Sequence, residues 1–485
     1  MKKKYFFILA TIFLIISVFI VSSIYDDKKN NIPDSVERFI PKSVKQFLIN
    51  NLFIKKRLYA VIESHKERIR IRTRQLKNEE KIVDKLLDEL YLNGLDNIKF
   101  FKVKSNEEIF STNSIKYKLT TFQTDHLSKG TWPHTKASVY LEKFGDKILL
   151  VSKDGIISFL DIEELNNDNF QTKIISSNIK DIINYDDWLE HGGKGLKDIL
   201  VNNGKLYISY SNLVDTDCYN TSIIVAEINL QYLEFENFFT PPTCKNIRKG
   251  FNRWSDNAGA GRIVEFSNES FLFSHGGFKT RVNAQDDTTV YGKIIKINKF
   301  TKNWEIVSKG HRNAQGLFFD KETQTILNTE HGPKGGDEIN INRLNETNVK
   351  NFGWPISSYG EHYGGREKNK LNYEEAPLYK SHTDHGFVEP VKYFVPSIGI
   401  SEIKKVSNTF NDEFVNDFFI GSMGSNISEG DMSIHHIRLN KENNKIIYND
   451  LIQIGERIRD ILIIEEAKKI ILFLENSAAI GILEM

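Results

Sequence analysis

The sequence predicts an all-β protein: a β-propeller that follows an N-terminal transmembrane helix and a helical stalk. Short β-rich runs separated by turn residues recur from about residue 125 to residue 485, and no long helical pattern interrupts them. Strands spaced in this way are typical of a sandwich, a barrel or a propeller. The region is too long for one sandwich, and it divides into six units of roughly 60 residues, which suits four-stranded blades. No clean internal repeat fixes the number of blades.

Composition excludes several classes of protein. The chain has 485 residues, with 65 basic and 64 acidic side chains and a formal net charge of +1. This balance excludes the general electrostatic footprint of a nucleic-acid-binding protein. The 40% hydrophobic content excludes wholesale disorder. The two cysteines are too few for a disulfide-dense scaffold or a cysteine-rich metal module.

Residues 1–26 are predicted to be a membrane anchor. Three lysines, Lys2 to Lys4, precede an uncharged run from Tyr5 to Tyr25, which as a helix would be about 32 Å long and match the hydrocarbon core. A cleaved signal peptide is the alternative, although its apolar region is usually shorter. The lysines favour a cytoplasmic N-terminus and export of the rest of the chain. Lys28 and Lys29 on the other flank reduce this charge asymmetry.

Residues 27–97 are predicted to form a helical, juxtamembrane stalk. Residues 43–92 contain no Gly or Pro and are rich in helix formers. A single heptad seam runs through them, but its companion positions His65, Arg72 and Glu79 are polar, and a coiled coil needs both seams apolar. We therefore expect a helical spacer and leave self-association open. The apolar seam consists of Ile62, Ile69, Leu76, Val83 and Leu90.

Strands are predicted at the β-rich runs, and several runs pair around a turn as hairpins do. In the first pair, Ile148 to Ser152 is followed by Lys153-Asp154-Gly155 and then by Ile156 to Phe159. Export would also place Cys218 and Cys244 in an oxidising compartment, where a disulfide can form; two unpaired buried thiols are the alternative. The predicted strands are Ser138–Leu141, Lys147–Ser152, Ile156–Leu160, Leu206–Tyr210, Ile223–Ile228, Ile294–Ile297 and Lys469–Phe473.

Polar, Gly-rich loops between residues 250 and 460 carry the candidate binding residues. Arg312 and Asn313 place a planar cationic fork beside an amide, which suits a ligand with several carboxylates. Arg457 and Arg459 alternate, so in a strand both project to one face and need an anion between them. The turn at Gly332-Pro333 can aim carbonyl oxygens at Ca²⁺. For each motif taken alone, an ion pair with a nearby acid or a plain turn is the alternative.

Together these motifs resemble a known family. GHRNAQGL (310–317), EHGPKGGDE (330–338), NFGWP (351–355), EPV (389–391) with PSI (396–398), and ERIRD (456–460) occur in the order and rough spacing of the pyrroloquinoline quinone (PQQ)-dependent aldose sugar dehydrogenases, the relatives of glucose and sorbosone dehydrogenase. The resemblance covers roughly residues 130–485 and implies a six-bladed propeller with PQQ in a central cleft. We therefore assign residues 125–485 to a glucose/sorbosone dehydrogenase-like propeller.

The resemblance also implies roles for individual residues. Arg312, Asn313, Arg457 and Arg459 match the cofactor-binding residues of the family, and Gly332 and Pro333 match the carbonyl donors of a Ca²⁺ that bridges to the cofactor. PQQ carries three carboxylates, which need paired cations when they are buried. The cofactor carries the redox chemistry, and the protein positions and polarises it.

Four expected groups are absent from this sequence. Ala258 stands where the family has the histidine that accepts the proton from the sugar hydroxyl, a function typically worth about 10²–10⁴-fold in rate. The acid expected in the next strand is absent from Phe273 to Phe278, and Gly424 and Gly193 replace the expected Lys and Gln. His275 is our candidate for a displaced catalytic base, with Asp256 as another candidate. Lys194 is a candidate for the lost cation.

These residues predict a membrane-anchored, exported, PQQ-dependent sugar dehydrogenase-like protein that oxidises an aldose by hydride transfer to the quinone. The propeller would lie on the periplasmic, extracytoplasmic side of a single-pass anchor, where electrons could pass to a membrane acceptor. The alternative is a non-catalytic propeller that binds a carbohydrate or a protein partner at the cell envelope, because a fold does not fix a function. A third, weaker alternative is a purely structural propeller on a stalk.

Overall fold

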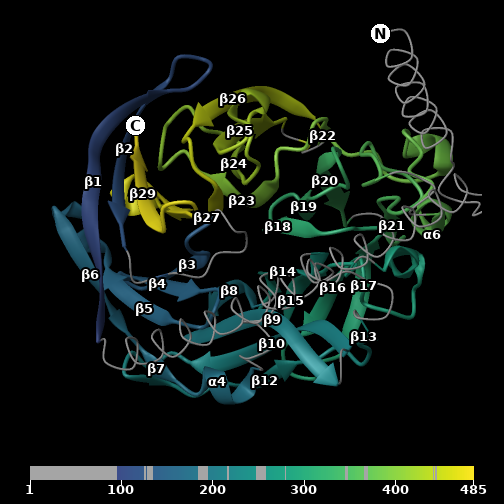
Figure 1. Ribbon diagram of the computed structural model, residues 1–485, viewed down its shortest axis with the longest axis horizontal. Coiled ribbons are helices and arrows are strands. Elements are labelled where there is room, and N and C mark those ends of the chain that lie inside the picture. Colours follow the sequence, from purple (N-terminus) through teal and green to yellow (C-terminus); the bar gives the residue numbers. More distant parts are fainter. Residues whose placement is uncertain are drawn as a thin grey trace, which may run out of the picture. The chain divides into compact units, whose positions relative to one another are not determined.

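Six blades, each built on four strands, stand around a common axis in the computed structural model (Figure 1). The structure describes residues 96–124, 127, 135–183, 195–215, 218–246, 258–278, 280–344, 348–364, 370–440, 442 and 445–485. No helix within these ranges combines the length and apolar character needed to cross a bilayer. The predicted span Tyr5–Tyr25 and almost all of the predicted stalk lie outside them.

The four main strands of each blade are antiparallel, and the strand named first below is the innermost. Blade I contains β3 (Val139–Phe144), β4 (Lys147–Ser152), β5 (Ile157–Asp161) and β6 (Asn169–Ile174), and blade II contains β8 (Leu196–Asn202), β9 (Lys205–Asp215), β10 (Cys218–Glu227) and β12 (Glu236–Phe239). Blade III contains β14 (Ala260–Ser267), β15 (Ser270–His275), β16 (Lys293–Asn298) and β17 (Trp304–Lys309).

Three further blades complete the ring. Blade IV contains β18 (Ala314–Asp320), β19 (Thr325–Glu330), β20 (Asp337–Arg343) and β22 (Lys392–Phe394), and blade V contains β23 (Ile400–Val406), β24 (Asp417–Ser422), β25 (Ser433–Leu439) and β26 (Ile446–Gln453). Blade VI contains β27 (Ile458–Ile464), β28 (Lys469–Leu474), β29 (Ala479–Glu484) and β2 (Lys116–Gln123). The inner strands contact one another in the cyclic order β3, β8, β14, β18, β23, β27 and back to β3.

The ring is closed by strands from both ends of the described chain. β2 pairs with β29, the last strand, and β1 (Asn97–Phe110) pairs with both β2 and β6, so blades VI and I share one sheet of nine strands. These two strands precede residue 125, where the sequence analysis placed the start of the propeller. β1 was missed because most of its residues are exposed and its apolar residues are interrupted by lysine, asparagine and glutamate.

The remaining elements are short. β7 (Ser176–Ser177) pairs with β11 (Tyr232–Leu233), β13 (Lys245–Asn246) with β10, and β21 (Lys350–Asn351) with β17. The helices α4 (Ile179–Ile182) and α6 (Lys370–Glu375) each form little more than one turn. The described chain is therefore almost entirely β, as predicted, and the predicted strands are present in blades I, II, III and VI.

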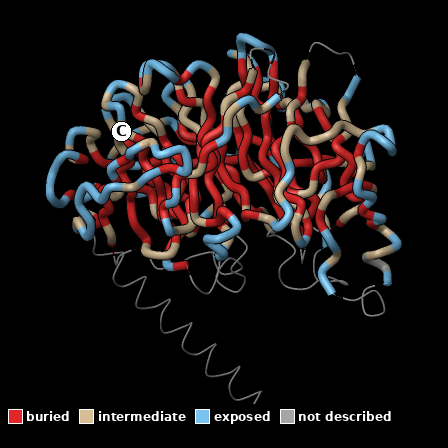
Figure 2. Tube along the Cα trace, turned by 90° about the horizontal axis from the view of Figure 1, so that it is seen from above, coloured by how far each residue is buried: buried red, intermediate tan, exposed pale blue. Residues whose placement is uncertain are grey.

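The hydrophobic core lies between the blades. In β28, Ile470, Leu472 and Leu474 pack toward blade V, while Ile471 and Phe473 pack toward blade I. Successive side chains of a strand point to opposite faces, so a strand buried on both faces is continuously apolar rather than alternating. Figure 2 shows the result: buried strands form the interior, and exposed turns occupy both ends of the blades.

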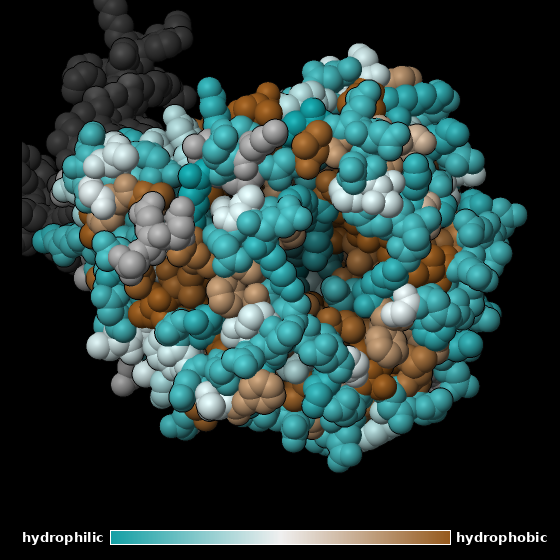
Figure 3. Space-filling view, turned by 180° about the vertical axis from the view of Figure 1, so that it is seen from behind, coloured by the Kyte–Doolittle hydropathy of each residue, from teal (hydrophilic) through white to brown (hydrophobic). Residues whose placement is uncertain are grey.

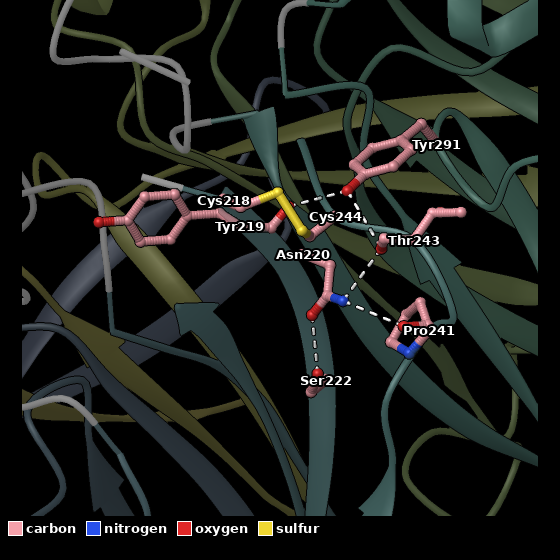
Figure 4. Close-up of a disulfide and its surroundings, with 8 residues drawn as sticks. All are labelled: Cys218, Tyr219, Asn220, Ser222, Pro241, Thr243, Cys244 and Tyr291. Atoms are coloured by element: carbon pink, nitrogen blue, oxygen red, sulfur yellow. Dashed lines mark hydrogen bonds between the residues drawn. A yellow bond between two sulfur atoms is a disulfide. The ribbon is translucent and has the colours of Figure 1, made fainter. Parts of the chain in front are cut away.

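A disulfide joins Cys218 to Cys244 at the edge of blade II (Figure 4). Tyr219 and Asn220 lie beside the bridge, and Asn220 Nδ2 donates to the carbonyls of Pro241 and Thr243 at 3.3 and 3.1 Å. The predicted bridge is therefore present. Closing a loop with a sequence separation of 26 contributes about 3 kcal/mol in the chain-entropy model.

Candidate functional site

The predicted binding residues lie at one end of the propeller axis. Arg312 and Asn313 directly precede the inner strand β18, and Arg459 lies at the start of the inner strand β27. Ala314 pairs with Glu330, so the turn that follows Glu330 emerges at the same end as Arg312. We call this end the axial mouth. A hollow is also visible at the centre of the ring on the face turned away from the viewer of Figure 1, bordered by both hydrophilic and apolar residues (Figure 3).

His331 shows that two of the predicted arginine positions come together. Arg312 Nη1 donates to the His331 carbonyl at 2.9 Å, and the His331 N–H donates to the Asn313 carbonyl at 3.0 Å. Burial lowers the pKa of the His331 side chain, Asp337 opposes this shift, and the charges of Arg312 and Arg459 lower the pKa further. Arg312 from blade IV and Arg459 from blade VI therefore act on one imidazole at the mouth.

Arg312 lies beside an aromatic ring and a second arginine. Its guanidinium carbon is 5.6 Å from the centre of the Trp354 ring, a favourable cation–π geometry. Arg281, in the short 3-10 helix Arg281–Gln285, lies close enough that burial and the charge of Arg312 both lower its pKa. The sequence analysis did not single out Arg281, because no motif surrounds it. Two guanidiniums from blades III and IV thus share this part of the mouth.

Asn313 is oriented inward and fixes the backbone of the neighbouring blade. Its side chain is 3% exposed, and its Oδ1 accepts hydrogen bonds from the Ala260 N–H at 3.0 Å and from Gln315 Nε2 at 3.1 Å. Asn313 therefore links blade IV to the first residue of β14. Its amide oxygen is thus used within the protein.

Arg457 and Arg459 converge on one carboxylate. Arg457 Nε donates to Glu475 Oε2 at 3.0 Å, and Arg459 Nε donates to Glu475 Oε1 at 2.6 Å. Glu475 is fully buried. Burial alone would raise its pKa, but the charges of Arg459 and Arg457 outweigh it and lower the pKa to about 2. The anion that the alternating arginines required is thus present, but Glu475 itself was not predicted.

The Gly332-Pro333 turn packs closely against neighbouring backbone oxygens, and its role as a Ca²⁺ ligand stays a prediction. A Cβ added at Gly332 would lie 2.0 Å from the Gly336 carbonyl oxygen and 2.7 Å from that of Gly335, so only glycine allows this approach. The Pro333 carbonyl accepts a long hydrogen bond of 3.5 Å from Ser397 Oγ. Among the described residues, no group of three His, Cys, Asp or Glu side chains has a geometry that could hold a metal ion. A cation here would depend on carbonyl oxygens.

His275, our candidate for a displaced base, is engaged in the core of blade III. It is 1% exposed, its Nε2 accepts the Thr221 N–H at 3.0 Å, and its Nδ1 lies 3.0 Å from the Gly276 carbonyl, to which it donates. Burial lowers its pKa to about 3. Both ring nitrogens are used and the ring packs against Tyr291 at 4.7 Å. The structure argues against the catalytic assignment of His275, and we do not carry it forward.

The positions of the missing base and lysine are filled differently. Ala258 is 3% exposed and its carbonyl accepts the Phe278 N–H at 3.1 Å. A Cβ added at Gly424, the lysine position, would lie 2.0 Å from Asp431 Oδ2. Asp431 is 3% exposed, and its Oδ1 has no hydrogen-bond partner among the described residues. Burial raises the pKa of Asp431.

The other positions that the sequence analysis singled out, Gly193, Lys194 and Asp256, lie outside the described residues.

A second charged cluster lies deeper along the axis, on the inner strands. Arg262 of β14 contacts Asp198 of β8 at 2.7 Å, Asp460 of β27 at 3.3 Å, and Glu402 of β23. All four side chains are at most 8% exposed. Burial raises the pKa of Glu402 to about 8, although Arg262 and Lys404 oppose this rise. One guanidinium therefore joins blades II, III, V and VI, and we call these four residues the axial cluster.

Comparisons with known proteins agree with this architecture. A family model described as Glucose / Sorbosone dehydrogenase matches residues 146–481. Aldose sugar dehydrogenase YliI of Escherichia coli (strain K12) is 26% identical over 292 residues, which are 56% of this chain and 72% of that protein. The uncharacterized protein slr1608 of Synechocystis sp. is 32% identical over 194 residues, 37% of this chain; the chain thus spans only 42% of that relative's length.

Solved structures show the same fold. A crystal structure of glucose dehydrogenase aligns with a TM-score of 0.58 at 20% identity and covers 76% of this chain and 99% of its own. The soluble aldose sugar dehydrogenase of Escherichia coli in its apo-form aligns with a TM-score of 0.57 at 20% identity, with the same coverage. At this level of identity the likeness concerns the fold, so the chemistry has to be argued from the site.

Proposed function

Because this chain belongs to the glucose/sorbosone dehydrogenase family, as its motifs predicted, we propose that it is a PQQ-dependent oxidoreductase that acts on an aldose sugar. The observation that carries the proposal is the group of guanidiniums at the axial mouth. Arg312 donates to the His331 carbonyl at 2.9 Å, and Arg457 and Arg459 share a single carboxylate. Two cations for one anion leave a positive charge for a ligand.

The residues present fit PQQ in their chemistry. The cofactor has three carboxylates, and guanidiniums are the side chains best suited to bind carboxylates through two parallel hydrogen bonds. Arg312, Arg457 and Arg459 would bind these groups, with Asn313 beside Arg312. When bound, PQQ supplies the hydride acceptor.

The protein's own residues would bind, orient and shield the reactants. Trp354 packs against Arg312 and restricts its orientation. Ala258 cannot accept a proton, so general-base catalysis by a residue at that position is lost. Ca²⁺, where it is used, would be held by the carbonyl oxygens of Gly332 and Pro333, the hard ligands that this ion prefers.

Titration calorimetry with PQQ, with and without Ca²⁺, tests the proposal, together with dye reduction in the presence of a panel of aldoses. We expect micromolar or tighter binding and turnover of at least one aldose. Arg438→Met is the control for arginine variants at the mouth, because Arg438 pairs with Asp417 in blade V and is not part of the mouth. We expect this control to bind PQQ as the wild-type protein does. Absence of PQQ binding by the wild-type protein would refute the proposal.

A non-catalytic role is the second candidate, and the buried Ala258 at the base position favours it. In this case the propeller would bind a carbohydrate or a protein partner at the cell envelope. Tight PQQ binding without reduction of the dye by any aldose would support this reading. Turnover of one aldose that is abolished by Arg459→Met would exclude it.

Membrane anchoring and export belong to the same proposal. The run Tyr5–Tyr25 would span the membrane once and hold the propeller on the extracytoplasmic side. The disulfide Cys218–Cys244 supports an oxidising compartment. Fractionation of cells tests both points: we expect the full chain in the membrane fraction and a variant without residues 1–26 in the soluble fraction. Protease added from outside the cytoplasmic membrane should digest the propeller.

A further inference from the structure

Glu475 binds Arg457 and Arg459, two of the arginines at the axial mouth. It lies directly after β28, in the turn that leads to β29, and is fully buried. Its two carboxylate oxygens are divided between the two guanidiniums: Oε2 accepts from Arg457 Nε at 3.0 Å and Oε1 accepts from Arg459 Nε at 2.6 Å. In each arginine it is the Nε atom, nearest the stem, that binds the glutamate.

The glutamate is itself held by its neighbours. Its backbone N–H donates to the Arg457 carbonyl at 2.9 Å, and its own carbonyl accepts the N–H groups of Lys136 and Ala137 at 2.9 and 3.3 Å. Ser138 Oγ donates to Oε1 of the side chain. Residues 136–138 lead into β3 of blade I, so Glu475 is fixed at the junction where the last blade meets the first.

We propose that Glu475 is a positioning residue, which uses the Nε atoms of Arg457 and Arg459 to set the orientation of both guanidinium groups for an anionic ligand at the axial mouth. The inference rests on the proposed function, because PQQ is the polycarboxylate considered. Two guanidiniums on one face repel each other, and the single carboxylate keeps them together while leaving a net positive charge. A ligand carboxylate would then meet cations whose orientation is already set, which lowers the entropic cost of binding.

The same contacts allow the opposite effect. If Glu475 competed with the ligand for the guanidiniums, its removal would free them and PQQ would bind more tightly. The two readings predict opposite changes in one dissociation constant. They can therefore be separated by measuring PQQ binding by full-length wild-type protein and by Glu475→Gln, with Ca²⁺ at the same concentration.

We expect Glu475→Gln to bind PQQ about 10–100-fold more weakly, the range seen when groups that orient binding residues are changed. Tighter or unchanged binding by this variant would overturn the positioning role. Failure of the wild-type protein to bind PQQ would instead overturn the proposed function, and the positioning role with it. A second readout is the absorption spectrum of bound PQQ, which should differ from wild type at saturating cofactor if the guanidiniums are reoriented.

Asp417→Asn provides a matched control for the loss of a buried carboxylate. Asp417 in blade V is fully buried and accepts hydrogen bonds from His436 at 2.7 Å and Arg438 at 2.8 Å, outside the mouth. We expect it to lower thermal stability but leave PQQ affinity unchanged.

If Glu475→Gln fails to fold, Ser138→Ala tests the same point, because it removes one hydrogen bond to Glu475 and keeps every charge. We expect about two- to five-fold weaker binding of PQQ by Ser138→Ala. Wild-type affinity in that variant would count against the proposal.

Discussion

The axial cluster and the arginine pair at the mouth contain the same kinds of side chain in opposite proportions. In the axial cluster, Arg262 faces three carboxylates, those of Asp198, Glu402 and Asp460. At the mouth, two arginines share the single carboxylate of Glu475. Both groups are buried or nearly so, but the axial cluster joins four blades, whereas Arg457, Arg459 and Glu475 all belong to blade VI.

The difference in proportion explains the difference in role. An excess of acid in a buried cluster favours protonation, so the pKa of Glu402 rises, mainly through burial. An excess of guanidinium cannot be relieved by losing protons, because arginine stays charged in proteins. The arginine pair therefore carries one positive charge more than its shared carboxylate, which an anionic ligand can neutralise, whereas Arg262 in the axial cluster is surrounded by acids and holds four blades together.

The largest effect is expected from Arg262→Met. Removing the guanidinium takes away the cation that all three buried carboxylates share and leaves Lys404, 4.0 Å from Glu402, as the remaining cation nearby. Breaking a buried ion pair from one side typically costs about 3–5 kcal/mol. Denaturant unfolding would measure the change. Arg438→Met should lower the free energy of unfolding far less. It removes a side chain that is 27% exposed and leaves Asp417 paired with His436. Equal losses in the two variants would contradict the comparison.

A smaller loss of stability is expected from Arg459→Met. Glu475 keeps Arg457 and Ser138 as partners, so the free energy of unfolding should fall by about 1–3 kcal/mol, the value of a hydrogen bond to a charged group. PQQ affinity should fall by roughly 10–100-fold, because the cofactor would lose one hydrogen bond to a charged group. Calorimetry and urea unfolding would measure both. If stability falls as far as in Arg262→Met while affinity is unchanged, the arginine pair is structural.

The axial cluster should also make stability depend on pH. The pKa of Glu402 rises from its ordinary 4.5 to about 8 in the folded protein, so between these values the folded state binds a proton that the unfolded chain has released. Stability should therefore decrease as pH rises from about 5 to 8, by about 1.4 kcal/mol per pH unit at most from this group. Asp198, Asp460, Arg262 and Lys404 face it. Glu402→Gln should flatten the slope in urea unfolding between pH 5 and 8.

The smallest effect on turnover is expected from His275→Ala. His275 is neutral, buried and bonded through both ring nitrogens, so it belongs to neither charged group. Turnover should stay within about two-fold of wild type, far from the 10²–10⁴-fold loss that follows removal of a general base. Steady-state dye reduction would measure it. A loss of that size, with the fold intact by circular dichroism, would restore His275 as the base.

Predictions from sequence succeeded where the signal was local. Runs such as Ile470 to Leu474 predicted strands because each strand is buried on both faces. The GHRN and ERIRD motifs drew attention to Arg312, Arg457 and Arg459, which the structure places at one end of the propeller axis, and their binding of a ligand stays a prediction. Glu475, by contrast, is a lone acid after an apolar strand, and nothing beside it shows that two arginines bind it. Arg281 lacks a motif, and β1 lacks a continuous apolar run.

Residue order alone predicts that the chain is β-rich, where most strands lie and which short motifs carry the arginines, because these properties depend on periodicity and on neighbouring residues. Which charges meet depends on how the ring closes in space. Closure of the ring brings β2 beside β29, residues 136–138 beside Glu475, and four inner strands around Arg262. The physical reason is that Coulombic and hydrogen-bond energies depend on distance in space, whereas the partners here are separated by up to several hundred residues along the chain.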